Sequence, residues 1–537
     1  MDGAQPEVGG TQMSTPVREN TSEPSSESAV TDRRAFLRGG ASLAAMAVGA
    51  AATAPAAASA QAPRGRFPAP APTGAAAVAA TWRDPLLRLV RRTTMGLNPA
   101  EVARARQLGY NGYLEYQLNH LAIDDTAVEQ FVATNYPMLS MDVATLRTQD
   151  RGQAEAQLQE STLYRGAFSN RQLYQRMVEF WTDHFTIAIT KDAIGNTKLI
   201  DDREVIRRHA LGNFYDLLRA SSKSAAMILY LDQQLNRTPN PNQNYAREIM
   251  ELHTLGVYGG YSQDDVAQLS RILTGWRALN FQFNVDPNGH DWNAKTWMGQ
   301  TYAAVPAGAG RTAAAAQAEG DRAVDFLLQH PSTARYIGWK MARWLLHYDP
   351  PQAAVDAAAA AYTSTRGDIK AMIRAILTRQ NLMAAQPLYK RPYHLAVSSM
   401  RSLGATALTM NGVRSIRGNY DQMNMRLFYW EQPNGWPYQV EWWSGLVLQR
   451  WRYAGFAANA NSNDYRFDLA KFRTGGASPD AIATRIIDEF FAGEVSARFR
   501  TELTTFLRGT PATTTVNDAR LRDGIALAMS STPYQWY

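Results

Sequence analysis

Signals that begin and end helices recur along most of this chain, and they constrain its fold more than any other feature. Residues 98–101 combine an Asn at the N-cap, a first-turn proline and a glutamate at the third helical position. Gly109 follows where that helix is expected to stop. Ser262 and Asp265 repeat the capping pattern ahead of a second apolar run. Such punctuation is typical of a protein built from many helices.

Apolar residues at spacings of three and four support the same prediction. They predict one-sided helices in six further ranges: 173–188, 321–347, 353–363, 368–380, 392–404 and 479–492. Only 281–285 alternates like a short strand, and no βαβ rhythm, phosphate loop or fixed-period repeat accompanies it. We therefore expect an all-α or predominantly α fold, a large multi-helix domain with irregular aromatic-rich loops, chiefly at 428–453. Two lobes are compatible with its length.

Composition narrows the chemistry. The chain has 537 residues and no cysteine, which excludes disulfides, thiolate metal ligands, iron–sulfur clusters and cysteine nucleophiles. Charged residues make up 19% and aromatic residues 10%, a balance typical of a folded chain.

The N-terminal segment has the features of a targeting signal. Arg33 and Arg34 precede Phe-Leu and then an uncharged, alanine-rich run over 39–63, a pattern that resembles a twin-arginine export signal. Asp32 departs from the usual pattern. Small residues before Ala60 place the cleavage after it. We expect a protein of the periplasm or cell envelope; the alternatives are a transmembrane anchor and a disordered tail.

This reading divides the chain into a signal peptide (1–60), a Pro/Ala/Gly-rich linker (61–80) and a helical domain (81–537). The leader holds four arginines and six acidic residues, so the mature chain's net charge is +9 rather than +7. Without a nucleic-acid-binding motif, an acidic polysaccharide or an anionic membrane surface fits this charge better than nucleic acid. The mature chain has no expected transmembrane helix.

The richest polar segment is 244–256. On a helical wheel Glu248 falls on the apolar face, so it needs a counter-charge, a proton or a bound cation. Glu251 lies further round, and His253 lies on the opposite flank. The alternative is structural: a core arginine neutralises Glu248, and Arg247 pairs with Glu251 one turn on.

Two histidines extend this hypothesis. His184 lies on the apolar side of the 173–188 helix, and His290-Asp291 follows in an irregular stretch. With Glu248 they would form a site for a divalent metal or for acid–base chemistry. Equally, His184 could be a hydrogen-bonded core residue and His290-Asp291 a turn. The catalytic candidates are therefore His184, Arg247, Glu248, Glu251, His290 and Asp291, and the metal candidates are His184, Glu248, His290 and Asp291.

A tryptophan-rich segment supplies a candidate binding surface, comprising Trp430, Trp436, Trp442 and Trp443. Exposed indole faces suit sugar stacking or a protein interface. The same rings also serve as ordinary core of a long helical domain, and that alternative stays open.

Several motifs together resemble the bacterial domain-of-unknown-function 1800 family. They are Trp-Thr-Asp-His-Phe at 181–185, the 244–256 segment, Leu-Thr-Gly-Trp at 273–276, His-Asp at 290–291, Lys-Arg-Pro at 390–392, Gln-Pro-Asn-Gly-Trp-Pro at 432–437 and Ser-Thr-Pro-Tyr-Gln at 531–535. The resemblance covers nearly the whole mature chain. It implies a helical, exported protein and, as a partner, a second exported protein that is phosphatase-like. It implies no established reaction.

The chain also departs from that family. Relatives often carry His-Asn-His where this chain has Thr182-Asp183-His184, so a two-histidine metal clamp is not kept. Gln243 and His253 depart from the common residues as well. Two functions remain in view: a non-catalytic binding or assembly partner in the envelope, which we favour, and a metal-assisted or acid–base enzyme acting on an envelope polysaccharide or another polymer.

Overall fold

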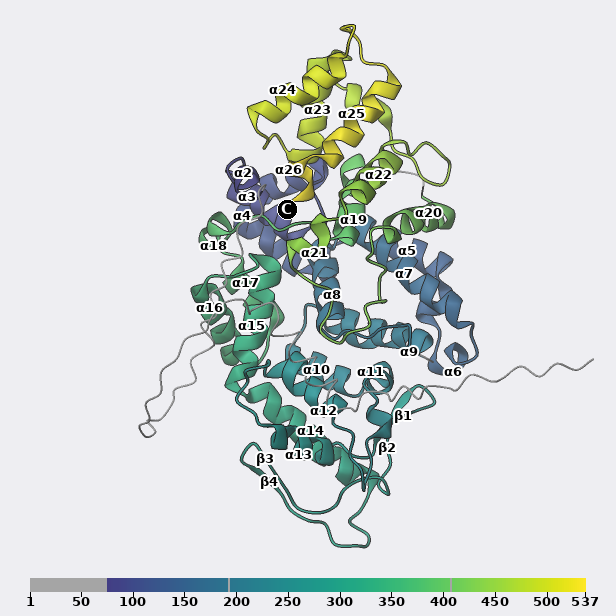
Figure 1. The fold of residues 1–537 in the computed structure, drawn as a ribbon, viewed down its shortest axis with the longest axis vertical. Coiled ribbons are helices and arrows are strands. Elements are labelled where there is room, and N and C mark those ends of the chain that lie inside the picture. Colours follow the sequence, from purple (N-terminus) through teal and green to yellow (C-terminus); the bar gives the residue numbers. More distant parts are fainter. Residues whose placement is uncertain (1–74, 192–193, 406–407) are drawn as a thin grey trace, which may run out of the picture. The chain divides into compact units, whose positions relative to one another are not determined.

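The computed structural model describes residues 75–191, 194–405 and 408–537 (Figure 1). The signal peptide, its cleavage after Ala60 and most of the predicted linker lie outside the described residues. The end of that linker is helical: α2 (Ala75–Ala79) buries Ala75 and Val78 against Trp82, Val440 and Trp536. Packing of the domain therefore extends before residue 81, because the two apolar residues share one helical face.

The fold is predominantly α-helical, as predicted. Before the hairpins the α-helices are α2 (Ala75–Ala79), α3 (Pro85–Thr93), α4 (Pro99–Leu118), α5 (Thr126–Asn135), α6 (Val143–Leu146), α7 (Arg151–Phe168), α8 (Gln172–His184), α9 (Ile194–Asp201), α10 (Phe214–Ser222), α11 (Ala225–Tyr230), α12 (Asn244–Glu248) and α13 (Gln263–Ile272). After them come α14 (Ala313–Gln329), α15 (Pro331–Leu345), α16 (Gln352–Thr365), α17 (Ile369–Ile376), α18 (Arg379–Ala384), α19 (Pro392–Leu403), α20 (Met410–Asp421), α21 (Val440–Ser444), α22 (Val447–Ala458), α23 (Pro479–Phe491), α24 (Ala497–Arg508), α25 (Asp518–Ser530) and α26 (Thr532–Gln535). Short 3-10 helices are η1 (His120–Ala122), η2 (Pro137–Ser140), η4 (Gln233–Leu235) and η6 (Leu469–Arg473), and π-helices are η3 (Asp202–Arg207) and η5 (Ile249–Thr254).

Two antiparallel hairpins interrupt the helices. β1 (Trp276–Leu279) pairs with β2 (Gln282–Val285), which confirms the predicted strand, and β3 (Lys295–Trp297) pairs with β4 (Gln300–Tyr302). β1, β3 and β4 were not predicted, because their residues do not alternate between polar and apolar as those of β2 do. Asn280 and Phe281 make the first turn with positive φ angles of 54° and 63°.

The predicted helix boundaries hold at two caps and at Gly109, and one break was not predicted. Asn98 accepts the amide of Ala100, and Ser262 forms a complete capping box with Asp265. Gly109 ends the first helical stretch as predicted: its φ of 67° is non-helical, and a second stretch of α4 continues beyond this kink. The single helix expected over 321–347 is two, because Pro331 forces the residue before it into an extended conformation.

The segment 244–256 is helical, but α12 passes into the π-helix η5 at Ile249. A π-turn takes more residues than an α-turn, so the angles of a regular helical wheel do not carry through the segment. Glu248, Glu251 and His253 are consequently all buried, where the wheel had placed the last two on opposite flanks.

The buried apolar residues form two large clusters. The first runs from α3 and α4 through α8 to α16 and α17, and the second joins α7 to α19, α20, α22, α23 and α25. Figure 1 shows α8 in the middle of this arrangement, with α19 on the side of the C-terminal helices. The boundary between the two cores is where the candidate site lies.

Candidate functional site

Helix α8 divides its side chains between the core and a polar face. Phe180 and Trp181 enter the first core, whereas Glu179 and Asp183, one turn apart, face the other way. The 432–437 motif closes over this helix. Gly435 has a φ of +80°, and a Cβ added there would lie 2.5 Å from the carbonyl oxygen of Asp183. Only glycine allows so close an approach, so the motif's glycine is what brings this loop against α8.

Buried ion pairs hold the polar face of α8 to the start of α19. Arg391 pairs with Glu179, and with Asp183 at 2.5 Å. Arg176 binds the second oxygen of Glu179 at 3.2 Å. Burial alone would lower the pKa of Arg391, but the two carboxylates outweigh it and raise that pKa, so the guanidinium stays charged. These pairings keep Glu179 and Asp183 in place at the rim of a cavity.

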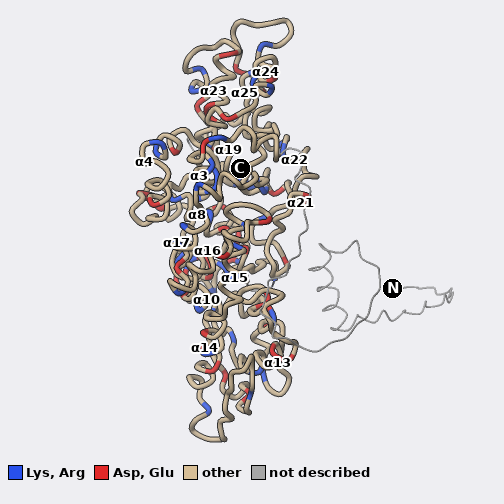
Figure 2. The backbone as a smooth tube through the Cα atoms, turned by 90° about the vertical axis from the view of Figure 1, so that its left-hand side faces the viewer, with Lys and Arg blue, Asp and Glu red and all other residues tan. Residues whose placement is uncertain are grey.

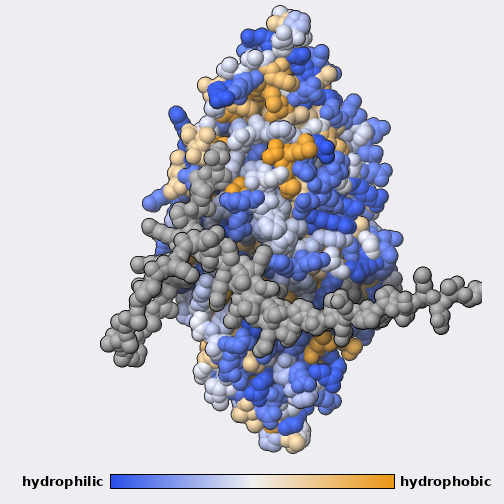
Figure 3. Space-filling model, viewed as in Figure 1, coloured by the Kyte–Doolittle hydropathy of each residue, from blue (hydrophilic) through white to orange (hydrophobic). Residues whose placement is uncertain are grey.

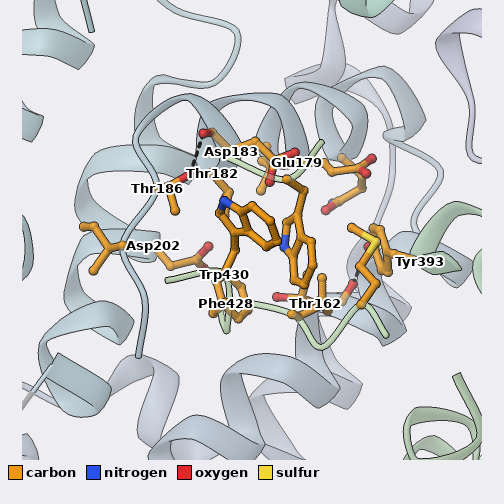
Figure 4. A pocket seen from close by; sticks show the side chains of 15 residues that line it. Thr162, Glu179, Thr182, Asp183, Thr186, Asp202, Tyr393, Phe428 and Trp430 are labelled. Carbon is orange, nitrogen blue, oxygen red and sulfur yellow. Dashed lines mark hydrogen bonds between the residues drawn. The ribbon is translucent and has the colours of Figure 1, made fainter. Parts of the chain in front are cut away.

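That cavity, the α8 pocket, lies between the two cores (Figure 4). Its volume is about 40 Å³, room for roughly three water-sized groups. The lining combines acidic, hydroxyl and aromatic side chains: Thr162, Gln175, Val178, Glu179, Thr182, Asp183, Thr186, Ile187, Asp202, Tyr393, Met425, Leu427, Phe428, Trp430 and Trp436. A mostly apolar lining with a few convergent polar groups is the composition typical of ligand sites.

Two polar atoms in this lining have no hydrogen-bond partner. Asp202 is 3% exposed, and its Oδ2 accepts from Arg207 Nε at 2.7 Å, but its Oδ1 is buried and unpaired. Thr162 Oγ1 is likewise buried and unpaired. In Figure 4 the Asp202 carboxyl lies beside Phe428 and Trp430. A buried acceptor without a donor is costly, so these atoms point to a missing hydrogen-bond donor.

His184 follows the pocket residues in sequence but is not part of the lining. Its Nε2 lies 3.1 Å from the His253 carbonyl oxygen, and the two imidazole rings are 6.0 Å apart. Burial lowers the pKa of His184 well below its usual value, and Lys340 lowers it further. His184 is therefore a neutral residue of the first core, in line with the structural alternative stated above.

Of the remaining candidates of the 244–256 segment, Glu248 and Glu251 are buried near Tyr336 of α15, and Arg247 is partly exposed. Burial first, and then the charges of Glu251 and Glu248, raise the pKa of Tyr336. Arg247 donates to Gln263 at 3.0 Å, a contact with α13 that the sequence had not suggested.

His290 and Asp291 lie beside the hairpins, where each has its own partner. His290 Nδ1 lies 2.8 Å from the Thr274 carbonyl oxygen and its Nε2 lies 3.3 Å from Glu319. Asp291 accepts from Arg271 at 2.7 Å. Within the described ranges no three His, Asp or Glu side chains are placed to hold a metal ion. The metal site predicted at His184, Glu248, His290 and Asp291 thus stays a prediction, because the structure does not bring these side chains together around one point.

The four candidate tryptophans form a chain from the core to the surface. Trp443 is buried, Trp436 is 9% exposed and Trp442 is 50% exposed. Ring centres are 5.8 Å apart for Trp443 and Trp436, 4.8 Å for Trp436 and Trp430, and 5.8 Å for Trp430 and Trp442. Trp430 and Trp436 line the α8 pocket.

Trp442 belongs to an exposed apolar patch together with Val447, Leu448 and Trp451. Figure 3 shows hydrophobic groups gathered on one face over α22. Figure 2 shows basic and acidic residues interspersed along the described chain. No helix in the described part of the chain is long and apolar enough to span a bilayer.

Sequence reasoning missed four charged residues of the site: Glu179, Asp202, Arg391 and Lys340. Lys340 on α15 is partly buried, and its ammonium lies 5.7 Å from the ring centre of Tyr336. Burial lowers the pKa of Lys340 to about 7, although Asp183 opposes that shift. The available signal was the Lys-Arg-Pro motif at 390–392, whose arginine is the partner of α8.

The family comparison agrees with these motifs. The model of the family described as "Protein of unknown function (DUF1800)" matches residues 88–536. No curated protein and no solved structure matches the chain. The matched range contains α8, the Lys-Arg-Pro motif and the loop that closes the α8 pocket. Because the match covers nearly the whole chain, the protein belongs to the DUF1800 family.

Proposed function

We propose that this protein is exported by the twin-arginine route to the periplasm or cell envelope and acts there by binding, through the α8 pocket. The observation that carries the binding role is the state of the pocket's acidic groups. Glu179 has both oxygens engaged by Arg176 and Arg391, and Asp183 is held by Arg391. A general acid or base must exchange its proton freely. Carboxylates fixed by arginines instead support recognition and shape.

The test uses the mature protein and soluble fragments of its own cell envelope. Trp430 and Trp436 line the pocket, so we expect a saturable change in tryptophan emission. The fragments should be recovered with unchanged masses. Trp430→Leu should lose the response, whereas Trp339→Leu, on α15 away from the pocket lining, should keep it. Fragments that are cleaved, or that leave the emission unchanged at every concentration, would contradict the binding role.

Export has its own test. Replacing Arg33 and Arg34 by lysine should stop both the appearance of the protein outside the cytoplasm and the cleavage after Ala60. Processing that continues in this double variant would contradict the twin-arginine route.

A protein partner would use a different surface. The exposed patch at Trp442, Val447, Leu448 and Trp451 is the place where a second exported, phosphatase-like protein would dock. An acidic polysaccharide fits the carboxylate-lined pocket poorly, because like charges repel there, and it would need the basic residues elsewhere on the surface.

An enzymatic role is the second candidate, and Lys340 is the observation that favours it. An amine with a pKa of about 7 is about half deprotonated at neutral pH, so it can act as a base. If the envelope fragments are converted, Lys340→Met should abolish conversion and Lys223→Met, a surface lysine paired with Asp321, should leave it unchanged.

A further inference from the structure

We propose that the α8 pocket binds a primary ammonium group carried on a flexible alkyl chain. This inference rests on the proposed function, because it names the chemistry that the binding pocket recognises. It follows from three features of the lining: a free carboxylate oxygen, a free hydroxyl and a set of aromatic rings.

The free carboxylate oxygen supplies the charge. Asp202 lines the cavity; its Oδ2 is held by Arg207, which fixes the carboxyl group and leaves Oδ1 buried without a donor. A charge-assisted bond from an N–H group to such an oxygen is about twice as strong as a neutral one. An ammonium group offers three such donors on one atom.

A second acceptor lies on another wall. Thr162 Oγ1 is buried and unpaired, while the nearby Tyr393 hydroxyl already donates to the Thr162 carbonyl oxygen at 3.1 Å. The ligand therefore meets an unused hydroxyl from α7 as well as the carboxylate at the start of η3. A group with several donors satisfies both.

Aromatic rings complete the recognition of a cation. Phe428, Trp430 and Trp436 line the pocket, and the Trp430 indole N–H is used by Asn434 at 3.1 Å. Ring faces attract cations, most strongly when water is excluded. Phe428 already has the Lys198 ammonium 5.9 Å from its ring centre. That charge is compensated by Asp201, at 2.5 Å from Lys198 Nζ, so it does not oppose a second cation.

Size decides among cations. A cavity of about 40 Å³ admits roughly three water-sized groups, which is too little for a sugar ring. An ammonium group is close to water in size, one or two methylenes would fill the remainder, and the rest of a longer chain would lie outside the cavity. The described residues supply no three-ligand set for a metal ion. A lysine side chain of a peptide and a free alkylamine present the same chemistry.

The experiment is calorimetric titration of the mature protein with two amines and two neutral analogues. The amines are n-butylammonium and Nα-acetyl-lysine methylamide, and the analogues are n-butanol and the same lysine derivative acetylated on Nε. We expect saturable binding of at least one amine, and at least tenfold weaker binding of its analogue. Binding of both amines means that a free amine suffices, whereas binding of the lysine derivative alone assigns the site to a peptide side chain.

Variants locate the binding. Asp202→Asn should weaken amine binding at least tenfold, and Thr162→Val, which keeps the side-chain shape and leaves the Arg207 pair intact, should weaken it severalfold. Asp232→Asn, which removes a partly exposed partner of Lys191, is the matched control and should bind as the wild type does.

Three results would overturn the proposal: neither amine binds, the neutral analogues bind as tightly as the amines, or the folded Thr162→Val protein binds like the wild type. A circular dichroism spectrum identifies any variant that fails to fold. Envelope fragments that bind while both amines fail would overturn this inference and leave the proposed function standing. Fragments that are cleaved would overturn the proposed function itself.

Discussion

Two buried polar clusters of this protein show how similar ingredients lead to different outcomes. In the hairpin cluster, His290 and Lys295 share Glu319, and Asp291 is held by Arg271. In the α8 cluster, arginines hold Glu179, Asp183 and Asp202 in a comparable way. The difference lies in what remains unpaired.

The charged groups of the hairpin cluster are paired with one another and stabilise the fold. The α8 cluster borders a cavity and has hydrogen-bond acceptors without a donor. Asp202 Oδ1 and Thr162 Oγ1 have no donor, and the indole rings of Trp430 and Trp436 line the same pocket. A buried charged cluster is thus a candidate binding site when it borders a cavity and some of its hydrogen-bond acceptors have no donor within the protein. The following predictions test this distinction.

Arg391→Met should have the largest effect. It leaves Glu179 with one partner and Asp183 with none, both buried. Removing one side of a buried ion pair costs about 3–5 kcal/mol. We expect the free energy of unfolding, measured with urea, to fall by an amount near the upper end of this range. The control is Arg414→Met, since Glu160 keeps Arg417 at 3.1 Å. Equal losses in both variants would contradict a special role for Arg391.

Trp436→Ala should follow, with a loss of about 3–4 kcal/mol expected for a nearly buried indole. Trp442→Ala should cost less than about 1 kcal/mol, because this ring is 50% exposed. Thermal unfolding of the two variants compares them directly. A similar fall in melting temperature for both would mean that Trp442 is covered in solution.

Glu319→Gln tests the hairpin cluster. Lys295 is fully buried, and this change removes the charge that pairs with it. We expect a loss of about 3 kcal/mol with amine binding unchanged. A Glu319→Gln protein that is as stable as the wild type, or one that loses amine binding, would contradict the claim that the hairpin cluster serves stability and not binding.

The pair of Glu319 and Lys295 also makes the stability of the protein depend on pH. Burial opposes ionisation of Glu319, but hydrogen bonds from His290 and Lys295 prevail and lower its pKa. Its contribution to stability is therefore present above the unfolded pKa and is lost as the pH falls through the lower folded value. In Glu319→Gln the acid-side decline in unfolding free energy should be shallower than in the wild type. Identical declines would show that Glu319 is not responsible.

Lys340 should produce a pH dependence of the opposite direction. Its pKa is lowered to about 7 in the folded protein, so between that value and the unfolded pKa the unfolded chain binds more protons. The unfolding free energy should then rise with pH across this window, by at most about 1.4 kcal/mol per unit. Lys340→Met should flatten that rise, and a curve parallel to the wild type would contradict the lowered pKa.

Much of the fold was predictable because caps and apolar spacing are local signals. Ser262 and Asp265 place the start of α13 correctly, since both residues act within one turn. The π-turn after Ile249 and the short hairpins carry no such signal, because tertiary contacts decide them. Beyond Ile249 a regular helical wheel therefore does not describe the positions of Glu251 and His253, both of which are buried.

The site was predictable only in pieces. The motifs at 181–185, 390–392 and 432–437 stood out in the sequence, but nothing local indicates that Arg391 reaches Asp183 or that Gly435 packs on the same residue. His184 attracted notice as a titratable residue, yet the helix turns it into the core and presents its neighbour Asp183 to the pocket. Asp202 had no distinguishing pattern at all.

The most direct test of the account is a crystal structure of the mature protein grown with n-butylammonium in excess. The account predicts the amine nitrogen in the α8 pocket, within about 3 Å of Asp202 Oδ1, with its alkyl chain against the ring of Trp430. A pocket holding only water while the amine is absent, or is bound elsewhere on the surface, would contradict it.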